Sequence, residues 1–439
     1  MKNFFKTILN IFGIEELKSR ILNTLGFLIV FRLGSFVTLP GVNPDLLMQD
    51  SEGLLGFLNI FLGGAFSRAS IFGLGIMPYI SASIILQLLT VAVPYFQKLQ
   101  KEGDSGRKKI NQITRVLTIA ICMAQSIGYL AATIPKEAIV SENHYFFRLS
   151  SIIILTGGTI FCMWLGERIT DKGIGNGISM LIMVGIISRF PSSLISEVYR
   201  LGISGALFFI IEVLILFFVV LIAVALTQAI RRVPVQYAKQ VIGNKIYGGQ
   251  RQYIPLKLNS SGVMPIIFAQ SLMFLPPLLA GFWSESSDTA VYVQTAFSRI
   301  ESWEYNLVFA VLIILFTFFY TAIMINPTQM ADDLKRNGGF IPGIKPGKQT
   351  SEFIDNVLSR LTLPGSIALA IIAILPSFAI KSGIDQGFAT FYGGTSLLIM
   401  VGVILDTLQQ IESYLLMRHY DGMMKSGKVR GRVASSPNL

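Results

Sequence analysis

Ten apolar runs, separated by charged or turn-forming segments, constrain this chain more than any other feature. They lie near residues 21–39, 75–94, 116–134, 150–167, 177–190, 205–229, 262–282, 306–325, 364–380 and 394–416. A helix that crosses a bilayer needs about 20 mostly apolar residues. Only 14 % of the residues are charged, whereas soluble domains carry about 25 %. Because lipid offers backbone groups no water partner, the sequence predicts an all-α membrane protein with ten transmembrane helices.

The distribution of basic residues predicts how these spans are oriented. Most of the 36 Lys and Arg residues lie in the N-terminal segment, the even-numbered loops and the C-terminal tail. Cytoplasmic loops carry the excess of Lys and Arg in membrane proteins, so both termini are predicted to be cytoplasmic. Residues 1–20 form an amphipathic cytoplasmic segment in this interpretation, and 417–439 form a basic tail. The net charge of +11 follows mainly from this asymmetry and does not require nucleic-acid binding.

Ten spans divide into two halves of five. The N-terminal half covers 21–190 with spans 1–5, and the C-terminal half covers 205–416 with spans 6–10. An odd number of spans per half makes the second half enter from the opposite side, which predicts two inverted five-helix halves. The polar segment 191–204 is the predicted external hinge between them. The halves show no convincing sequence similarity, so this prediction depends on topology alone.

An apolar segment before the second run is too short to span a membrane. Residues 53–66 are interrupted by Gly63 and Gly64. Irregular backbone at membrane depth must be buried in protein or line a cavity. One interpretation is a short re-entrant helix that fills a central pore, and the alternative is a helix lying on the membrane surface.

Six isoleucines are candidates for a hydrophobic constriction. They are Ile76, Ile80, Ile178, Ile182, Ile267 and Ile399. The first two, and likewise the next two, are separated by four residues and so share one helix face. On spacing alone, ordinary core or lipid-facing residues are the simpler interpretation. A ring of such branched apolar side chains would exclude water and ions.

Two predicted cytoplasmic loops, 230–261 and 326–362, are long, basic and rich in turn residues. The first contains no Asp or Glu. Its stretch 241–253 has Gly-Asn and Gly-Gly turn signals between short runs, which predicts a hairpin. Such projections indicate a docking surface for a large partner, and the alternative is positive-inside charge without any partner.

A polar residue inside a membrane costs free energy, so each one is a candidate for a functional role or for pairing with another group. Arg32 lies near the middle of the first run, so it needs a partner or a wet cavity. Gln87, Glu212 and Asp406 are the other candidates, and Glu212 is expected near a membrane interface. No pair of acids recurs at matched positions in the two halves, which disfavours an ion-coupled transporter. A secondary transporter nevertheless stays an alternative, because it shares ten helices and inverted halves.

Catalytic and metal-binding patterns are not found in the sequence. It contains no G-x-S-x-G, H-E-x-x-H or phosphate-loop motif, which disfavours an intramembrane enzyme. Cys122 and Cys162 both lie in apolar stretches, which fits buried hydrophobic residues better than a disulfide framework. We therefore expect no cofactor, no metal and no enzymatic activity.

Several stretches resemble the SecY family, the channel subunits of the bacterial Sec protein translocase. They are IVFRLGSF at 29–36, AFSRASIFGLGIMPYISASI at 65–84, KEGDSGR at 101–107, GIGNGIS at 173–179, residues 247–262, FIPGIKPG at 340–347 and GGTSLLI at 393–399. They occur in order across residues 15–425. The resemblance implies a channel in the bacterial plasma membrane that passes unfolded, signal-bearing polypeptides and opens sideways into lipid.

The resemblance also assigns roles to individual residues. The six isoleucines match the family's pore ring one by one. Segment 53–70 matches the plug, with Phe61, Gly63, Gly64 and Arg68 in it. Gln87 and Asn259 match polar positions of the lateral gate, where runs 2 and 3 face runs 7 and 8.

The partners implied are the subunits SecE and SecG, the motor ATPase SecA, the ribosome, precursor polypeptides and membrane lipids. SecE would clamp the hinge side, and SecA would supply ATP hydrolysis. The predicted docking residues are Arg231, Arg232, Lys239, Lys245, Arg251, Lys345 and Lys348. Lys345 stands where the family usually has Arg, so it keeps the charge but loses the planar fork. The loop tip 243–245 carries one basic residue where relatives often have two.

Overall fold

The structure is a computed structural model. It describes residues 14–47, 63–140, 143–202, 205–237, 240–242, 245–247, 251–273, 276, 292–293, 295–297 and 299–425. Residues 1–13, most of the predicted plug including Phe61, and the tail from 426 lie outside the described residues.

The first half of the chain is helical. Its helices are α2 (Glu15–Gly34), α4 (Met77–Ala92), α5 (Pro94–Lys101), α6 (Asp104–Thr133), α7 (His144–Lys172) and α8 (Gly177–Leu201), with short 3-10 turns η1 (Pro44–Leu46) and η2 (Lys136–Ala138). Asn143 and Asn176 cap α7 and α8, because their side-chain oxygens accept hydrogen bonds from backbone N–H groups of the first turn.

The second half contains helices and a small amount of sheet. Its elements are α9 (Ala206–Gln228), β1 (Ile230–Tyr237), β2 (Gln240–Ile242), β3 (Lys245–Tyr247), β4 (Arg251–Lys257), α10 (Met264–Leu272), α13 (Trp303–Met324), α14 (Pro327–Arg336), β5 (Gly339–Phe340), α15 (Lys348–Lys381), α16 (Gln386–Ala389), η4 (Thr390–Tyr392) and α17 (Gly394–Lys425).

Every predicted apolar run overlaps one of these helices. Seven helices in the described part of the chain are long and apolar enough to cross a membrane, or eight if α4 and α5, which bend by 102° at their junction, form one broken span. α2 carries too many charges to qualify, and α10 has only nine described residues. The helical membrane class is confirmed, whereas the count of ten spans stays a prediction.

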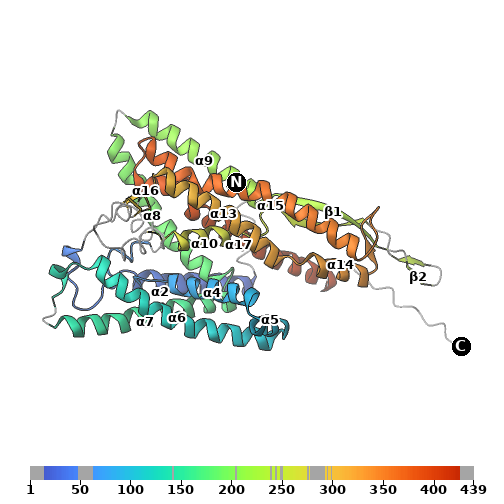
Figure 1. Cartoon of the computed structure of the whole chain (residues 1–439), viewed down its shortest axis with the longest axis horizontal. Helices are drawn as coiled ribbons and strands as arrows, with labels where there is room; N and C mark the ends of the chain where they lie inside the picture. Colours follow the sequence, from blue (N-terminus) through green and yellow to red (C-terminus); the bar gives the residue numbers. More distant parts are fainter. Residues whose placement is uncertain are drawn as a thin grey trace.

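The two halves pack as two groups of helices (Figure 1). In the first group α4 packs on α6, α6 on α7, and α7 on both α2 and α8. In the second group α13 packs on α15 and α10, and α17 packs on α9 and α15. α8 contacts α17, which joins the groups. The described helices therefore pack in two groups, and the division into two inverted halves stays a prediction.

The predicted hinge is mostly helical. α8 continues to Leu201 and contains Pro191, so the residues that separate it from α9 are only 202–205. Gly202 ends α8 with φ of +61°, a conformation that favours glycine. Glu197 is buried, accepts a hydrogen bond from the Asp385 backbone N–H at 2.9 Å and pairs with Arg200. Glu197 and Arg200 of the predicted hinge thus pair on a helix.

The two long basic segments fold together at one end of the molecule, where β1, β2 and α14 lie in Figure 1. β1 pairs antiparallel with β4 and with β5, which gives a three-stranded sheet in the order β4-β1-β5. β2 and β3 form the predicted hairpin beyond it. Segment 326–362, expected as a loop, instead contains α14 and the first turns of α15. Its Leu334 and Ile354 pack with Val235 in a small core of their own.

Close backbone contact between α7 and the residues before α4 generates a stability prediction. A Cβ added at Gly158 would lie 2.2 Å from the Ile71 carbonyl oxygen, whereas one at its neighbour Gly157 meets nothing within 4 Å. Gly158→Ala is expected to cost about 1–3 kcal/mol through overpacking. Gly157→Ala should be neutral or stabilise by about 0.5–1 kcal/mol. Thermal unfolding of the purified variants measures both, and equal effects would contradict the packing described.

Candidate functional site

The six isoleucines selected from the sequence meet in one hydrophobic cluster. Ile76 and Ile80 from the start of α4, Ile182 from α8 and Ile399 from α17 are buried members, and Ile178 and Ile267 pack against it partly buried. The four buried isoleucines expose between 2 % and 8 % of their surface. Side chains from four helices in both halves of the chain therefore belong to one apolar cluster.

Helix beginnings bring these side chains together. Ile76 is the N-cap of α4, and Pro78 follows in the first turn, where its missing N–H costs nothing. α8 begins at Gly177 and packs closely against α7 at this point. A Cβ on Gly177 would lie 1.9 Å from the Gly166 carbonyl oxygen of α7. Tight α7–α8 packing thus places Ile178 and Ile182 in the cluster.

The described end of the predicted plug, residues 63–70, is held between α2, α6 and α8. Gly63 and Gly64 have φ of +64° and +86°. Arg32 of α2 donates from Nη1 to the Gly63 carbonyl oxygen at 3.0 Å, and the Tyr129 hydroxyl of α6 donates to the Phe66 carbonyl oxygen at 2.7 Å. Arg68 lies with its guanidinium 4.3 Å from the centre of the Phe36 ring. The segment is therefore folded into the protein.

The predicted gate residues lie in different environments. Asn259, between β4 and α10, is buried, and its Oδ1 accepts a hydrogen bond from the Ser261 hydroxyl at 3.1 Å. Gln87 of α4 has a buried Oε1 with no hydrogen-bond partner. No hydrogen bond joins Gln87 to Asn259 within the described part of the chain, and their assignment to a lateral gate stays a prediction.

The predicted docking residues lie in the folded basic region. Arg231 and Arg232 are exposed on β1, and Lys345 and Lys348 are exposed before and at the start of α15. Lys245 is in β3 and Arg251 begins β4. Lys239 lies outside the described residues.

Sequence reasoning missed residues that join distant elements. Arg189 of α8 lies against Gly64, because a Cβ on Gly64 would be 2.5 Å from Arg189 Nη2. Its position seven residues after Ile182, in a mostly apolar run, was the available signal. Gln410 of α17 accepts from the Gly175 backbone N–H at 2.8 Å, and Thr24 of α2 accepts from the Ile174 N–H at 3.0 Å. These bonds tie both halves to the turn before α8.

Glu212 is paired more specifically than its predicted interfacial position implied. One carboxylate oxygen lies 4.0 Å from Arg200 Nη2, and the other is buried without a partner. Arg200 also contacts Glu197, so one guanidinium serves two carboxylates near the junction of α8 and α9. This cluster connects the helices that flank the junction of the halves.

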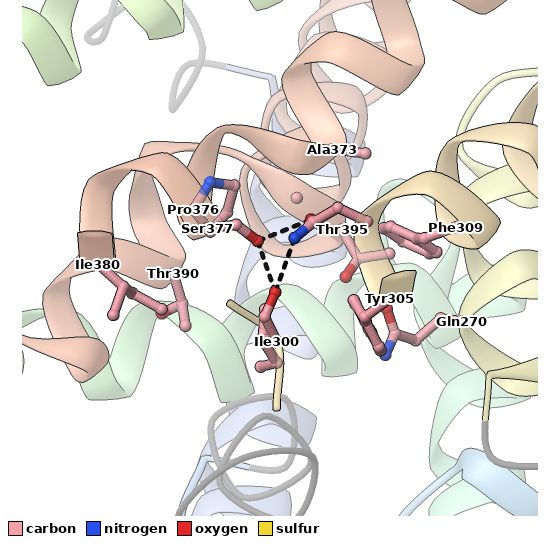
Figure 2. A pocket seen from close by; sticks show the side chains of 12 residues that line it. Gln270, Ile300, Tyr305, Phe309, Ala373, Pro376, Ser377, Ile380, Thr390 and Thr395 are labelled. Atoms are coloured by element: carbon pink, nitrogen blue, oxygen red, sulfur yellow. Dashed lines mark hydrogen bonds between the residues drawn. The ribbon is translucent and has the colours of Figure 1, made fainter. Parts of the chain in front are cut away.

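A small pocket lies between α10, α13, α15 and α17 (Figure 2). Its polar lining is largely paired: Gln270 Nε2 lies 3.2 Å from the Tyr305 hydroxyl, and Ser377 Oγ lies 2.8 Å from the Ile300 carbonyl oxygen. Thr395 Oγ1 is buried without a partner. These contacts join α10 to α13, and α15 to the segment before α13, and they do not form a catalytic set.

Comparison with known proteins identifies the family. The sequence model of the SecY family matches residues 70–408. The protein translocase subunit SecY of Halalkalibacterium halodurans is 44 % identical over 443 residues, covering 96 % of this chain and 100 % of that protein. The same subunit of Streptomyces scabiei is 43 % identical, covering 94 % and 98 %. The chain belongs to the SecY family.

Solved structures share the fold. One, described as the structure of a protein conducting channel, has a TM-score of 0.62 at 16 % identity and covers 95 % of each chain. Sec61 in the canine ribosome-channel complex from the endoplasmic reticulum has a TM-score of 0.58 at 16 % identity, with 95 % of each chain covered. The all-helical membrane architecture is therefore the one found in these channels.

The packing of residues 63–70 between α2, α6 and α8 generates a prediction. Gly64→Ala adds backbone strain and drives a Cβ into the Arg189 guanidinium, whereas Gly202→Ala adds the same kind of strain in open space. We expect Gly64→Ala to increase hydrogen exchange in the peptide covering 63–70, measured by mass spectrometry, and Gly202→Ala to leave that peptide unchanged. Equal exchange in wild type and Gly64→Ala would show that the Gly64–Arg189 contact is not needed to keep residues 63–70 packed.

Proposed function

We propose that this chain is a protein-conducting channel that passes unfolded, signal-bearing polypeptides across the bacterial plasma membrane and releases transmembrane segments sideways into lipid. It is a channel and not an enzyme. The observation that supports the proposal is that the six isoleucines from α4, α8, α10 and α17 belong to one apolar cluster. This cluster lies where helices of the two halves meet, which is where a transmembrane path between the halves would run.

The cluster has the physical properties of a seal. Apolar contacts are non-directional, so they can be remade around a threaded chain of any sequence. A constriction of branched apolar side chains also excludes water and ions when it is closed. Ala65, Phe66 and Ala69 of segment 63–70 pack in a second apolar cluster, and Met77 packs against both clusters. Displacement of this segment would accompany opening, which is the role proposed for the plug with Phe61, Gly63, Gly64 and Arg68.

Sideways release requires the halves to separate along a seam. Gln87 and Asn259 are the polar residues proposed for this lateral gate. The buried Gln87 Oε1 has no partner, and an unpaired buried acceptor is costly. A seam that is imperfectly satisfied when closed can be opened by an apolar signal helix that offers better packing.

The orientation and the partners belong to the same proposal. Both termini and the basic region around β1 would face the cytoplasm, where the positive-inside rule places Lys and Arg. The exposed Arg231, Arg232, Lys345 and Lys348 would bind the ribosome or SecA, because release of counterions from phosphate-rich RNA favours basic surfaces. SecE would lie at the hinge side and SecG at the periphery.

The proposal is tested by protease protection of a secretory precursor in proteoliposomes that contain this chain with SecE. SecA and ATP are added in one arm and omitted in the other. Protection that requires SecA, ATP and an intact signal sequence is the expected result. Absence of protection, with all partners bound and SecA hydrolysing ATP, would contradict the proposal and favour a solute transporter, which solute-flux assays would then detect.

Polar substitution in the isoleucine cluster should weaken the seal. Ile80→Ser and Ile399→Ser each place a hydroxyl in the closed apolar contact, whereas Ile371→Ser alters a side chain of α15 that is 58 % exposed. We expect the first two to raise ion leak from proteoliposomes about tenfold or more and to admit precursors with defective signal sequences. The Ile371→Ser control should leak like wild type. Unchanged leak in both cluster variants would contradict the role as a seal.

A further inference from the structure

Three arginines from different parts of the chain converge on the turn at residues 63–64. Arg32 of α2 donates to the Gly63 carbonyl oxygen at 3.0 Å. The guanidinium of Arg189 in α8 fills the space beside Gly64, where an added Cβ would lie 2.5 Å from Nη2. Arg68 and Arg32 both lie over the Phe36 ring, at 4.3 and 5.1 Å from its centre. We call Arg32, Arg68 and Arg189 the arginine cluster.

The arginine cluster has no acidic partner in the described part of the chain. The ion pairs in the described part of the chain involve other residues, and none includes Arg32, Arg68 or Arg189. Arg68 Nη1 and Arg189 Nε are buried and have no hydrogen-bond acceptor. Two buried N–H donors and three like charges in one region are costly unless an acceptor with negative charge is bound there.

The dimensions of the region restrict what can bind. Gly63 and Gly64 contact the arginine side chains so closely that even a methyl group at either position would clash. Arg68 Nη1 and Arg189 Nε are themselves buried, so a lipid headgroup or an acidic peptide cannot reach them, whereas a small anion accepts hydrogen bonds from several guanidinium groups at once.

We propose that the arginine cluster binds a small inorganic anion of the chloride class beside the Gly63–Gly64 turn. The anion accepts from Arg68 Nη1 and Arg189 Nε and neutralises the repulsion among the three guanidinium groups. Since Arg32 belongs to α2, Arg189 to α8 and Arg68 to the 63–70 segment, the bound anion links these three parts of the chain. Anion binding therefore stabilises the packed arrangement of residues 63–70.

The test is equilibrium binding of radiolabelled chloride to the purified full chain by scintillation proximity, with gluconate holding ionic strength constant. We expect saturable binding that inorganic phosphate competes for weakly or not at all. Arg68→Gln and Arg189→Gln should each weaken it at least tenfold. Arg148→Gln, which alters an exposed arginine at the start of α7, is the matched control and should bind like wild type.

Several results would overturn the proposal. One is the absence of saturable chloride binding in wild type. A second is unchanged binding in Arg68→Gln and Arg189→Gln. A third is binding that appears only after the double substitution Asp50→Asn with Glu52→Gln. The last result would mean that carboxylates outside the described residues already neutralise the cluster. Should the glutamine variants fail to fold, bromide-soaked crystals of the wild-type protein decide, because an anomalous peak beside Arg68 and Arg189 is required. The assay needs no translocation partner, so its outcome is independent of the proposed function.

Discussion

Apolar packing between the two helical halves is the interaction on which the rest of this structure depends. α8 and α17 bring the halves into contact, and the six isoleucines belong to an apolar cluster that both halves share. Helices in lipid gain little hydrophobic free energy by associating, so close van der Waals packing and interhelical hydrogen bonds hold them together. The same contacts are non-directional and specify no particular sequence. The proposed seal would therefore be stable when closed and could still separate to admit a chain.

Close backbone approach is what allows this packing. Glycines at Gly158 and Gly177 leave room for carbonyl oxygens of neighbouring segments, at distances where any larger side chain would clash. Gly63 and Gly64 similarly leave space that arginine side chains fill. The geometry near the cluster therefore combines dry apolar contact with a strongly basic region beside it. The apolar part is the proposed seal, and the basic part is the proposed anion site.

Much of the fold was predictable because membrane-spanning helices appear in a sequence as long apolar runs. Each predicted run overlaps a helix, and the Gly-Asn turn signal predicted the β2–β3 hairpin. Two boundaries differed. The polar stretch after residue 190 is helical because Glu197 and Arg200, separated by three residues, pair on one helix face. Segment 326–362 contains α14 and the beginning of α15 because its apolar residues pack with β1.

The sequence by itself determined the membrane class, the approximate helix positions and the family, because hydropathy and local motifs are properties of consecutive residues. It also selected the six isoleucines, although only the resemblance raised them above ordinary core residues. Tertiary structure decided that they share one cluster, that Arg189 meets Gly64, and that Gln87 Oε1 is left unpaired. Helical periodicity specifies which residues share a face, but not what lies opposite that face. Contacts between residues far apart in the chain depend on how the helices pack.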